Sequence, residues 1–325
     1  MKRIFVAGGM GFIGSNFVRH LLSTYDDYRI VNYDKLTYAG NTDNLRDIEK
    51  SRNYKFVKGD ICNAEKVHEA MRGADMVVNF AAESHVDRSI ANPAEFIKTD
   101  VFGTYTLLQE ARKHEVEKFV QIGTDEVYGS VEKGHSLETD LLQPRNPYSA
   151  SKAGADLIAN SFHKTYDLPV VITRSSNNFG PYQYPEKIIP LFITNLLRGK
   201  HVPLYGDGMN KRDWLYVQDN CEAIDLVMRK GAKGQTYNIG GGNEVTNIEL
   251  TKMVLAELGK GESMIDYVDD RLGHDRRYAV DCSKVNALGW KPKHDFREAL
   301  RETIGWYVKN RGWWTKILQK NGAMS

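Results

Sequence analysis

Tyr148 and Lys152 have the residue types and the spacing needed to move a proton. They lie four positions apart in a segment predicted to be helical from about Pro147, so both side chains should project from one helix face. A free tyrosine has a pKa of about 10, and a neighbouring ammonium group favours its ionised form. Tyr148 could then take the proton of a substrate hydroxyl group. The alternative for this spacing is an ordinary pair on a helix surface.

A second group suited to acid and base chemistry is Thr124-Asp125-Glu126, which directly follows a predicted strand over residues 119–123. Closely spaced carboxyl groups push their pKa values apart, which leaves one protonated and one ionised at the same pH. Such a pair could protonate a departing hydroxyl group while it removes a carbon-bound proton. The pattern therefore favours elimination of water. The alternative is a solvated Asp-Glu turn.

Three glycines near the amino terminus have the spacing of a phosphate-binding turn. Gly8, Gly11 and Gly14 lie between a predicted strand over residues 3–7 and a predicted amphipathic helix over residues 15–22. Gly8 permits the tight turn, Gly11 lets the backbone approach a pyrophosphate, and Gly14 lets the helix pack closely on the strand. The amino end of the helix attracts phosphate groups as well. The motif predicts a dinucleotide site.

Asp34 ends the second predicted strand, twenty positions after Gly14. This is the spacing of the acidic residue that binds the adenosine ribose, and a carboxylate there favours NAD over NADP. The adjacent Lys35 weakens that preference, and a turn or helix cap is the alternative role for Asp34. A nicotinamide cation beside Tyr148 would favour the phenolate, and Lys152 would hold the nicotinamide ribose. We therefore expect an enzyme that uses NAD to move a hydride.

The elements that must position these residues alternate between short apolar runs and helical stretches. This alternation predicts parallel strands joined by helical crossovers, and the nearly continuous apolar runs predict helices on both faces of the sheet. The expected fold class is α/β, a Rossmann-like doubly wound parallel sheet. Its strands are expected at residues 3–7, 29–34, 54–58, 76–81, 119–123 and 170–174.

After the sixth strand, Pro and Gly interrupt the pattern, and we expect a smaller mixed α/β lobe that binds the substrate. A chain of 325 residues is long enough for two lobes. Residues 1–174 are expected to form the NAD-binding Rossmann domain, with segments near 214–242 returning to it, and residues 175–325 mainly the substrate-binding lobe. Strands at 214–217 and 237–239 and helices at 187–197 and 247–258 are expected there.

Composition and charge exclude several classes of partner. The formal net charge is only +2 and basic residues are scattered along the chain, so no nucleic acid is expected. Cys62, Cys221 and Cys282 lack the spacing of a zinc site or a disulfide framework, so we expect reduced thiols and no metal. No apolar run reaches about 18 residues and no leader signal is evident. A cytoplasmic protein without membrane contact is expected.

The glycine turn, Asp60, Tyr148 and Lys152, in this order, resemble the extended short-chain dehydrogenase/reductase superfamily along essentially the whole chain. This resemblance implies a sugar nucleotide as the substrate. Thr124-Asp125-Glu126 looks like the corresponding run of the dTDP-glucose 4,6-dehydratases. Further segments similar to theirs are residues 81–89, 175–183, 185–187, 212–214 and 273–275.

The resemblance to these dehydratases implies a reaction in three steps. NAD takes a hydride from sugar C4 while Tyr148 acts as the base and Thr124 binds the same oxygen. The ketone acidifies the C5 proton, which Glu126 removes as Asp125 protonates the leaving C6 hydroxyl group. The hydride then returns to C6, so a 4-keto-6-deoxy sugar nucleotide forms without net oxidation.

The resemblance also implies contact residues. Two arginines in loop-like segments of the second lobe could bind the diphosphate in a fork geometry, with surface ion pairs as their alternative, and a tyrosine near the base could instead be core packing. Besides the residues named above, the expected cofactor contacts are Phe12, Ile13, Leu36, Thr37, Asp60, Ile61, Ala81, Ala82, Ser84, Thr99 and Asn178. The expected substrate contacts are His85, Thr124, Asn177, Lys187, Ile188, Pro203, Tyr205, Arg212, Asn247, Arg271 and His274.

Several alternatives remain open at the level of sequence. Leu272 stands where the dehydratases usually have proline, and residues 218–220 read Gln-Asp-Asn where Glu-Asp-His is common, which leaves the nucleobase open between dTDP, UDP and GDP. A sugar-nucleotide epimerase or decarboxylase, or a non-catalytic NAD-binding protein, are the other readings. The resemblance implies a homodimer through helices around 99–114 and 149–164. Trp313-Trp314 is expected to be a packing anchor.

Overall fold

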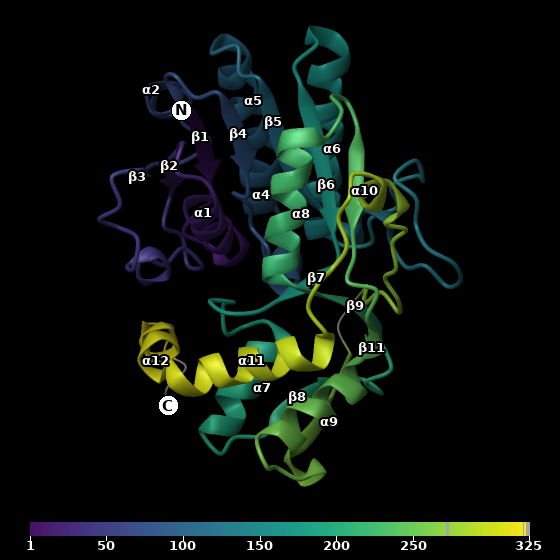
Figure 1. The fold of residues 1–325 in the computed structure, drawn as a ribbon. Helices are drawn as coiled ribbons and strands as arrows, with labels where there is room; N and C mark the ends of the chain where they lie inside the picture. Colours follow the sequence, from purple (N-terminus) through teal and green to yellow (C-terminus); the bar gives the residue numbers. More distant parts are fainter. Residues whose placement is uncertain (271–272, 321, 323–325) are drawn as a thin grey trace.

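The computed structural model describes residues 1–270, 273–320 and 322. Within these residues the largest sheet has seven strands, all parallel, in the order β10-β6-β5-β4-β1-β2-β3 (Figure 1). The predicted fold class is therefore confirmed. The strands are β1 (Lys2–Ala7), β2 (Tyr28–Asp34), β3 (Tyr54–Lys58), β4 (Met76–Asn79), β5 (Lys118–Thr124), β6 (Val170–Ser175) and β10 (Thr236–Ile239).

Alternate residues of β1 face opposite layers, which explains its continuous apolar character. Ile4 and Val6 belong to one buried cluster, and Phe5 and Ala7 to another. Helices cover both faces, as expected for a parallel sheet. The first face carries α1 (Phe12–Thr24) and α8 (Val217–Lys230), and the second carries α2 (Ala64–Met71), α5 (Thr104–Lys113) and α6 (Pro147–Tyr166) (Figure 1).

The strand order places a switch point beside β1. From β1 the chain proceeds outward through β2 and β3, and it then returns to β4 on the other side of β1 and continues through β5 and β6. In such a sheet the crossover connections on the two sides leave a crevice outside the carboxyl ends of the strands. The glycine turn after β1 and the loops after β2, β4 and β5 all open into that crevice.

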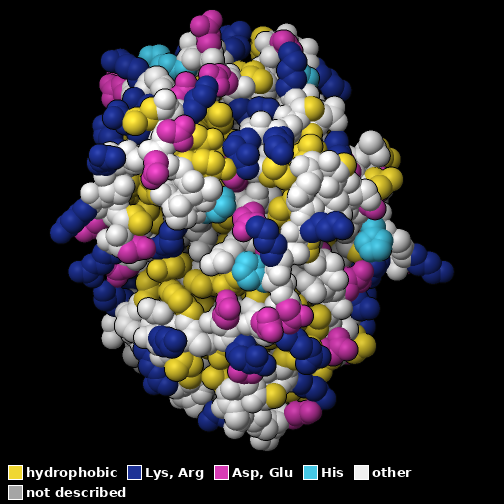
Figure 2. Space-filling model, in the orientation of Figure 1, with side chains coloured by type: hydrophobic (Ala, Val, Ile, Leu, Met, Phe, Trp, Pro, Cys, Tyr) yellow, Lys and Arg dark blue, Asp and Glu magenta, His cyan; other side chains and the backbone are white. Residues whose placement is uncertain are grey.

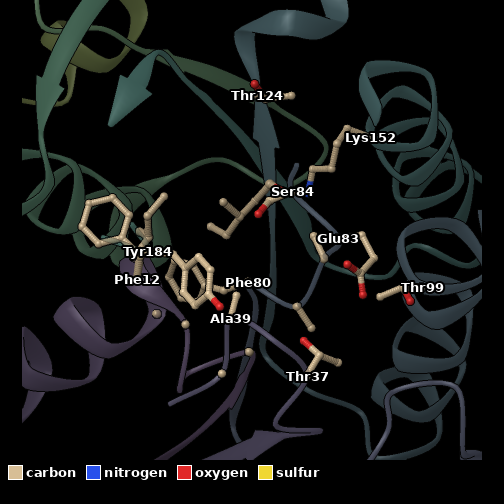
Figure 3. Close-up of a pocket in the computed structure, with 18 of the residues that line it drawn as sticks. Phe12, Thr37, Ala39, Phe80, Glu83, Ser84, Thr99, Thr124, Lys152 and Tyr184 are labelled. Carbon is tan, nitrogen blue, oxygen red and sulfur yellow. Dashed lines mark hydrogen bonds between the residues drawn. The ribbon is translucent and has the colours of Figure 1, made fainter. Parts of the chain in front are cut away.

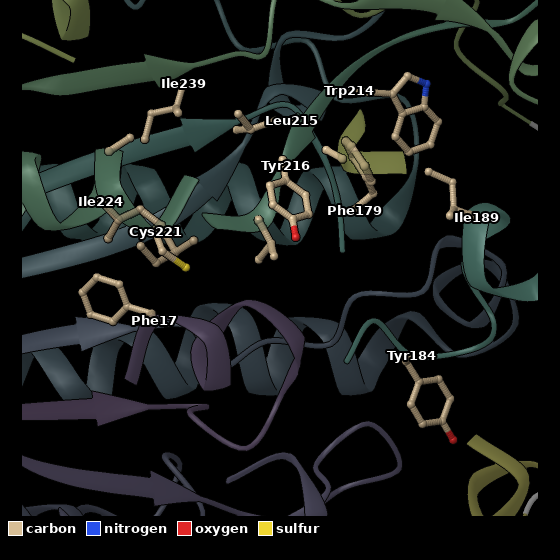
Figure 4. Packing of buried hydrophobic residues seen from close by; sticks show 14 of the residues in the cluster. Phe17, Phe179, Tyr184, Ile189, Trp214, Leu215, Tyr216, Cys221, Ile224 and Ile239 are labelled. Carbon is tan, nitrogen blue, oxygen red and sulfur yellow. The ribbon is translucent and has the colours of Figure 1, made fainter. Parts of the chain in front are cut away.

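A second group of elements lies beyond this edge (Figure 1). Its core contains Phe179, Trp214, Tyr216 and Phe296, whose rings pack together, and Figure 4 shows the first three of these at close range. The small strands are β7 (Asn177–Phe179), β8 (Val202–Tyr205), β9 (Lys211–Tyr216), β11 (Glu244–Thr246) and β12 (Ile265–Val268). Its helices are α7 (Ile188–Leu197), α9 (Asn247–Glu257), α11 (Phe296–Lys309) and α12 (Arg311–Lys320). The short helix α10 (Ser283–Ala287) lies apart from them and packs against β10 of the large sheet.

The two strands expected near residues 214–217 and 237–239 belong to different sheets. β10 pairs with β6 in the large sheet, whereas β9 pairs with β7 and β11 in a separate sheet of three strands. α8, which joins them in sequence, packs on α1. The exact division at residues 174 and 175 remains a prediction, because segments on both sides of it build the large sheet.

Short elements complete the first lobe and alter one expected helix. The segment expected to be one helix over 99–114 begins as the π-helix η2 (Ile97–Gly103) and continues as α5. π-Helical turns inside helices are often found at functional sites, and Thr99 of this turn lines the cavity described below. The remaining short elements of this lobe are η1 (Thr42–Leu45), α3 (Val86–Ala91), α4 (Pro93–Phe96) and η3 (Asp125–Tyr128), whereas η4 (Glu262–Met264) lies between α9 and β12 in the second group.

The tryptophan pair near the carboxyl terminus is a packing anchor, as predicted. Both side chains are nearly buried. The Trp313 indole N–H donates to the Asn44 side chain at 2.9 Å, and that of Trp314 donates to the Tyr307 carbonyl at 2.9 Å. α12 is thereby tied to η1 in the first lobe.

The surface shows no accumulation of one charge on the face drawn in Figure 2, where Lys and Arg side chains alternate with Asp and Glu. None of the helices within the described residues is both long enough and apolar enough to cross a membrane. The three cysteines are free thiols.

Candidate active site

A cavity lies at the carboxyl edge of the large sheet, where the glycine turn, the loops after the strands and the start of the second lobe meet. Figure 3 shows side chains from both halves of the sheet around it, with Thr124 and Lys152 at one end and Thr37 at the other. Nearly all of the residues predicted to contact the cofactor line this cavity, and only Leu36 does not.

The glycine turn forms a cradle that larger residues would fill. Gly8 has φ +77°, and a Cβ atom there would lie 2.5 Å from the Ala81 backbone nitrogen. A Cβ on Gly14 would lie 2.4 Å from the Gly8 carbonyl oxygen, so this glycine is required by helix packing. A Cβ on Gly11 would meet only that carbonyl, at 3.4 Å. The protein itself thus leaves space at Gly11, the position predicted to face a pyrophosphate.

The amino end of α1 is open towards the cavity. Gly11 is its N-cap residue and no side chain caps the helix. The first backbone N–H groups of a helix have no partner within it, and together with the helix dipole they attract anions. Phe12 and Ile13, the first residues of α1, line the cavity. The cavity therefore contains an uncapped helix end suited to phosphate groups, beside the glycine turn.

Asp34 combines a structural role with its place in the cavity. Its carboxylate accepts hydrogen bonds from the backbone N–H groups of Met10 at 2.9 Å and Leu36 at 2.7 Å. Burial raises the pKa of this carboxyl group, and the two backbone hydrogen bonds oppose the shift. Lys35 forms an ion pair with Asp60 at 2.8 Å, and its expected effect on the preference for NAD stays a prediction.

The two adjacent carboxyl groups lie at the other end of the cavity, in η3. Thr124, the N-cap residue of η3, accepts a hydrogen bond from the Glu126 backbone N–H at 3.3 Å, and its hydroxyl group donates to Asp125 at 3.3 Å. Burial raises the pKa of Asp125 well above its ordinary value, and the negative charges of Glu126 and Asp213 add to the shift. This environment therefore favours the protonated form of Asp125 over the carboxylate.

Tyr148 and Lys152 both line the cavity from α6, but their relation differs from the expected one. The Lys152 ammonium group donates to the Ile122 carbonyl at 2.6 Å. Burial and the negative charges of Glu126 and Asp100 raise the pKa of Tyr148 well above 10. The protein groups alone thus disfavour the phenolate, because the carboxylates lie around the phenol while the lysine is held by the backbone.

Two further acidic residues, Asp100 and Glu83, were not predicted as site residues; the charge of Asp100 acts on Tyr148 and Lys152, and Glu83 contacts Asp100. Asp100, on η2, accepts hydrogen bonds from the Ser151 hydroxyl at 2.6 Å and the Glu83 backbone N–H at 2.8 Å. Burial raises the pKa of Asp100 to about 6, and burial together with Asp100 raises that of Glu83 to about 7. Glu83 could have been predicted as a site residue because it follows the end of β4, whereas no feature of the sequence indicated Asp100.

Several polar atoms of the cavity are buried without a partner. Asp125 Oδ2, Glu126 Oε2, Asn177 Oδ1 and Asn178 Oδ1 have no hydrogen bond within the described residues. Buried polar atoms in native proteins are nearly always paired. Together with the glycine cradle, these atoms fit a polar ligand with phosphate at one end and hydroxyl groups at the other, which matches a dinucleotide beside a sugar.

The residues predicted to contact the substrate are only partly brought together. Thr124, Asn177 and Lys187 line the cavity, and the Lys187 ammonium group donates to the Ser84 carbonyl at 2.5 Å. Arg271 lies outside the described residues. The lining does not include His85, Ile188, Pro203, Tyr205, Arg212, Asn247 or His274.

Arg212 differs from its expected setting. It lies in β9 and not in a loop, and it is nearly buried. Its guanidinium group donates to the carbonyls of Lys211 and Asp275, each at 2.8 Å, and stacks over the Tyr278 ring at 4.4 Å. Its charge counteracts part of the shift in the pKa of Asp125. The contact with a diphosphate stays a prediction.

A separate cluster, His68, Glu110 and His114, has potential metal-ligand atoms within 4.8 Å of one another on α2 and at the end of α5. His68 Nδ1 lies 2.8 Å from the Glu110 carboxylate, which also accepts from Lys113 at 2.7 Å. His114 Nε2 lies 3.0 Å from the His68 carbonyl. The potential ligand atoms are therefore already in hydrogen-bond contact with one another, with Lys113 or with the backbone.

Comparison with known proteins gives consistent results along the whole chain. Residues 5–303 match the family model described as GDP-mannose 4,6 dehydratase. The chain is 52% identical over 305 residues to the low-salt glycan biosynthesis protein Agl12 of Haloferax volcanii, covering 94% of this chain and 98% of that protein. It is 51% identical over 323 residues to a dTDP-glucose 4,6-dehydratase of Streptomyces antibioticus, covering 98% and 96%.

Among solved structures, DesIV, a dTDP-glucose 4,6-dehydratase from Streptomyces venezuelae crystallised with NAD and TYD bound, is closely similar. The TM-score is 0.95 at 50% sequence identity, with 97% of this chain and 99% of that chain covered. The similarity thus includes the large sheet, the second lobe and the cavity between them.

Proposed function

Because this chain belongs to the GDP-mannose 4,6-dehydratase family and is similar over its full length to dTDP-glucose 4,6-dehydratases, we propose that it is an NAD-dependent dTDP-glucose 4,6-dehydratase. The product would be dTDP-4-keto-6-deoxyglucose. The observation that carries this proposal is the meeting of Asp125, Glu126 and Tyr148 in one cavity with the glycine cradle.

The dinucleotide would be held by the open end of α1, by Asp34 at the adenosine ribose and by Lys152 at the nicotinamide ribose. When bound, the nicotinamide ring supplies the reversible oxidation at C4 and the reduction at C6. The chain contributes the walls that exclude water, and Ile122 keeps the Lys152 ammonium group near the ring site through the hydrogen bond at 2.6 Å.

The protons are moved by side chains of the protein. Tyr148 takes the proton of the C4 hydroxyl group, and Thr124 binds the same oxygen. The ketone at C4 acidifies the C5 proton, which Glu126 removes. Asp125 protonates the departing C6 hydroxyl group, and the raised pKa of this buried carboxyl group supports the assignment because the acid must carry a proton at working pH. In an epimerase reaction Asp125 and Glu126 would have no acid/base role.

The choice of nucleotide is the first testable part of the proposal. The purified protein is to be incubated with NAD and, in parallel, with dTDP-glucose, UDP-glucose and GDP-mannose. Mass spectrometry should detect a product lighter by one water, with a 4-keto group, from dTDP-glucose ahead of the others, as the named relatives suggest. A product of unchanged mass would favour the epimerase reading, and preference for another nucleotide would correct the substrate.

We further propose a homodimer formed through η2, α5 and α6. These neighbouring elements carry large apolar side chains that are exposed in the single chain. Exposed contiguous apolar surface of this kind is typical of protein interfaces. The residues are Ile97, Phe102, Tyr105, Leu157 and Tyr166, with exposed fractions of 59, 50, 40, 60 and 47%.

Replacing Leu157 by Asp is expected to convert the dimer into monomers, because a charge would be buried without a partner at the interface. Light scattering after size exclusion should report half the mass of the unmodified protein. Leu141→Asp is the control, since Leu141 is 80% exposed and lies in the loop that precedes α6, outside the proposed interface helices. A monomeric unmodified protein, or an unchanged dimer of Leu157→Asp, would refute this interface.

We also propose that the enzyme acts in the cytoplasm. The free thiols of Cys62, Cys221 and Cys282 support a reducing compartment.

A further inference from the structure

Three segments that are far apart in sequence meet at the side of the cavity. The first follows β2 and contains Tyr38, the second contains Arg88 of α3, and the third begins the second lobe and contains Glu186. We call these three residues the clasp. Each of the three segments also contributes directly to the cavity lining. Figure 3 shows Thr37 and Ala39 of the first, Ser84 of the second and Tyr184 of the third, and Glu186 and Lys187 line the cavity as well.

Arg88 joins the other two members of the clasp. Its guanidinium carbon lies 3.8 Å from the centroid of the Tyr38 ring. Its Nη2 donates to a Glu186 carboxylate oxygen at 3.3 Å. A planar guanidinium group can stack on a ring and bind a carboxylate at the same time, which an ammonium group does less well.

The surroundings of the clasp strengthen the connection between the lobes. Glu186 is 16% exposed, and His85 Nε2 lies 3.9 Å from its carboxylate. The Tyr38 ring contacts the Tyr184 ring edge-on, with 5.4 Å between their centroids. Next to them, the Lys187 ammonium group donates to the Ser84 carbonyl. The start of the second lobe is therefore fastened to two loops of the sheet edge at the cofactor cavity.

We propose that Arg88 and Glu186 are positioning residues that retain the dinucleotide in its cavity throughout the catalytic cycle, by tying the second lobe to the loops that follow β2 and β4. This inference rests on the proposed function. In this proposal the clasp controls the release of the cofactor and takes no part in the proton transfers.

The proposed reaction gives the reason for such a device. The sugar is oxidised at C4 and reduced at C6 by the same pair of electrons, so no oxidant is consumed. If the reduced dinucleotide left between the two events, the sugar would remain oxidised and the enzyme would need an external oxidant to start again. Slow release of the cofactor is therefore of direct use. None of the three clasp residues needs to contact the sugar for this purpose.

The test measures cofactor release in the absence of sugar. Protein saturated with NAD is diluted, and the NAD that remains bound is quantified over time after rapid desalting. Arg88→Ala and Glu186→Gln should each accelerate release by about tenfold, because an ion pair and a stacked guanidinium group are lost or weakened. The double variant should release NAD no faster than the single variants, since both contacts belong to one unit.

Arg301→Ala is the matched control. Arg301 forms an ion pair with Glu257 at 3.2 Å on the outer helices of the second lobe, and neither residue lines the cavity. The Arg301→Ala variant should release NAD at the same rate as the unmodified protein. Arg88→Lys should lie between the unmodified protein and Arg88→Ala, because it keeps the charge and loses the planar group. Thermal unfolding curves identify any variant whose fold is damaged.

Two results would overturn the clasp: an unchanged release rate in Arg88→Ala, or fully additive effects in the double variant. With the nucleotide sugar present, Arg88→Ala should raise the KM for NAD by a larger factor than it lowers kcat, whereas equal changes would contradict retention. Failure of the proposed function has a different signature, namely NAD retention of the expected pattern without a dehydrated product from any sugar nucleotide.

Discussion

Glu126→Gln is expected to stop the elimination of water while leaving the oxidation at C4 intact. The amide has nearly the shape of the carboxylate but cannot take up the C5 proton. Loss of one positioned base typically costs about 10²- to 10⁴-fold in rate, and the formation of the 4-keto-6-deoxy product should fall by that amount. The reduced cofactor should accumulate on the enzyme after sugar is added, which absorbance near the nicotinamide band measures in a single-turnover experiment.

Glu132→Gln is the control for this variant. Glu132 is exposed in the loop that follows the same strand and does not line the cavity. Its turnover should equal that of the unmodified enzyme. If Glu126→Gln forms product at the unmodified rate, Glu126 is not the base. If it forms product slowly without accumulation of reduced cofactor, the oxidation is impaired instead and the division of tasks between Glu126 and Tyr148 is wrong.

Tyr148→Phe is expected to abolish both the oxidation and the formation of product. The phenol oxygen is the group that takes the C4 hydroxyl proton, and the variant loses only that oxygen. We expect a loss of about 10²- to 10⁴-fold in the rate at which reduced cofactor forms, because no other base replaces it. Binding of NAD should persist. Tyr166→Phe, on the same helix but exposed, is the control.

The pH dependence of the first step distinguishes this role from a structural one. Because burial and the carboxylates of Glu126 and Asp100 raise the pKa of Tyr148, the phenolate form is scarce at neutral pH and becomes more abundant as the pH rises. The rate of C4 oxidation in the unmodified enzyme should therefore increase with pH above neutrality. The residual rate of Tyr148→Phe should lack this increase. If the residual rate of Tyr148→Phe increased with pH in the same way as the rate of the unmodified enzyme, a group other than Tyr148 would be responsible for the pH dependence.

Local sequence was sufficient to predict the glycine turn between β1 and α1. The spacing of Gly8, Gly11 and Gly14 between a strand and a helix reflects short-range sterics, and the backbone of the turn has the close approaches that the motif predicts. The strands of the sheet were found within a few residues of their predicted ends because buried apolar runs carry a strong signal. Tyr148 and Lys152 likewise share a helix, so their spacing alone placed them together.

The α/β class, the glycine turn and the carboxyl pair at the end of a strand were predictable because each depends on residues that are close together along the chain. Three other features became visible only in the folded protein: β9 leaves the large sheet while β10 joins it, Lys152 binds the Ile122 carbonyl, and Arg88 binds Glu186. These features depend on contacts between segments far apart in sequence, where packing and the pairing of buried polar groups outweigh local preference.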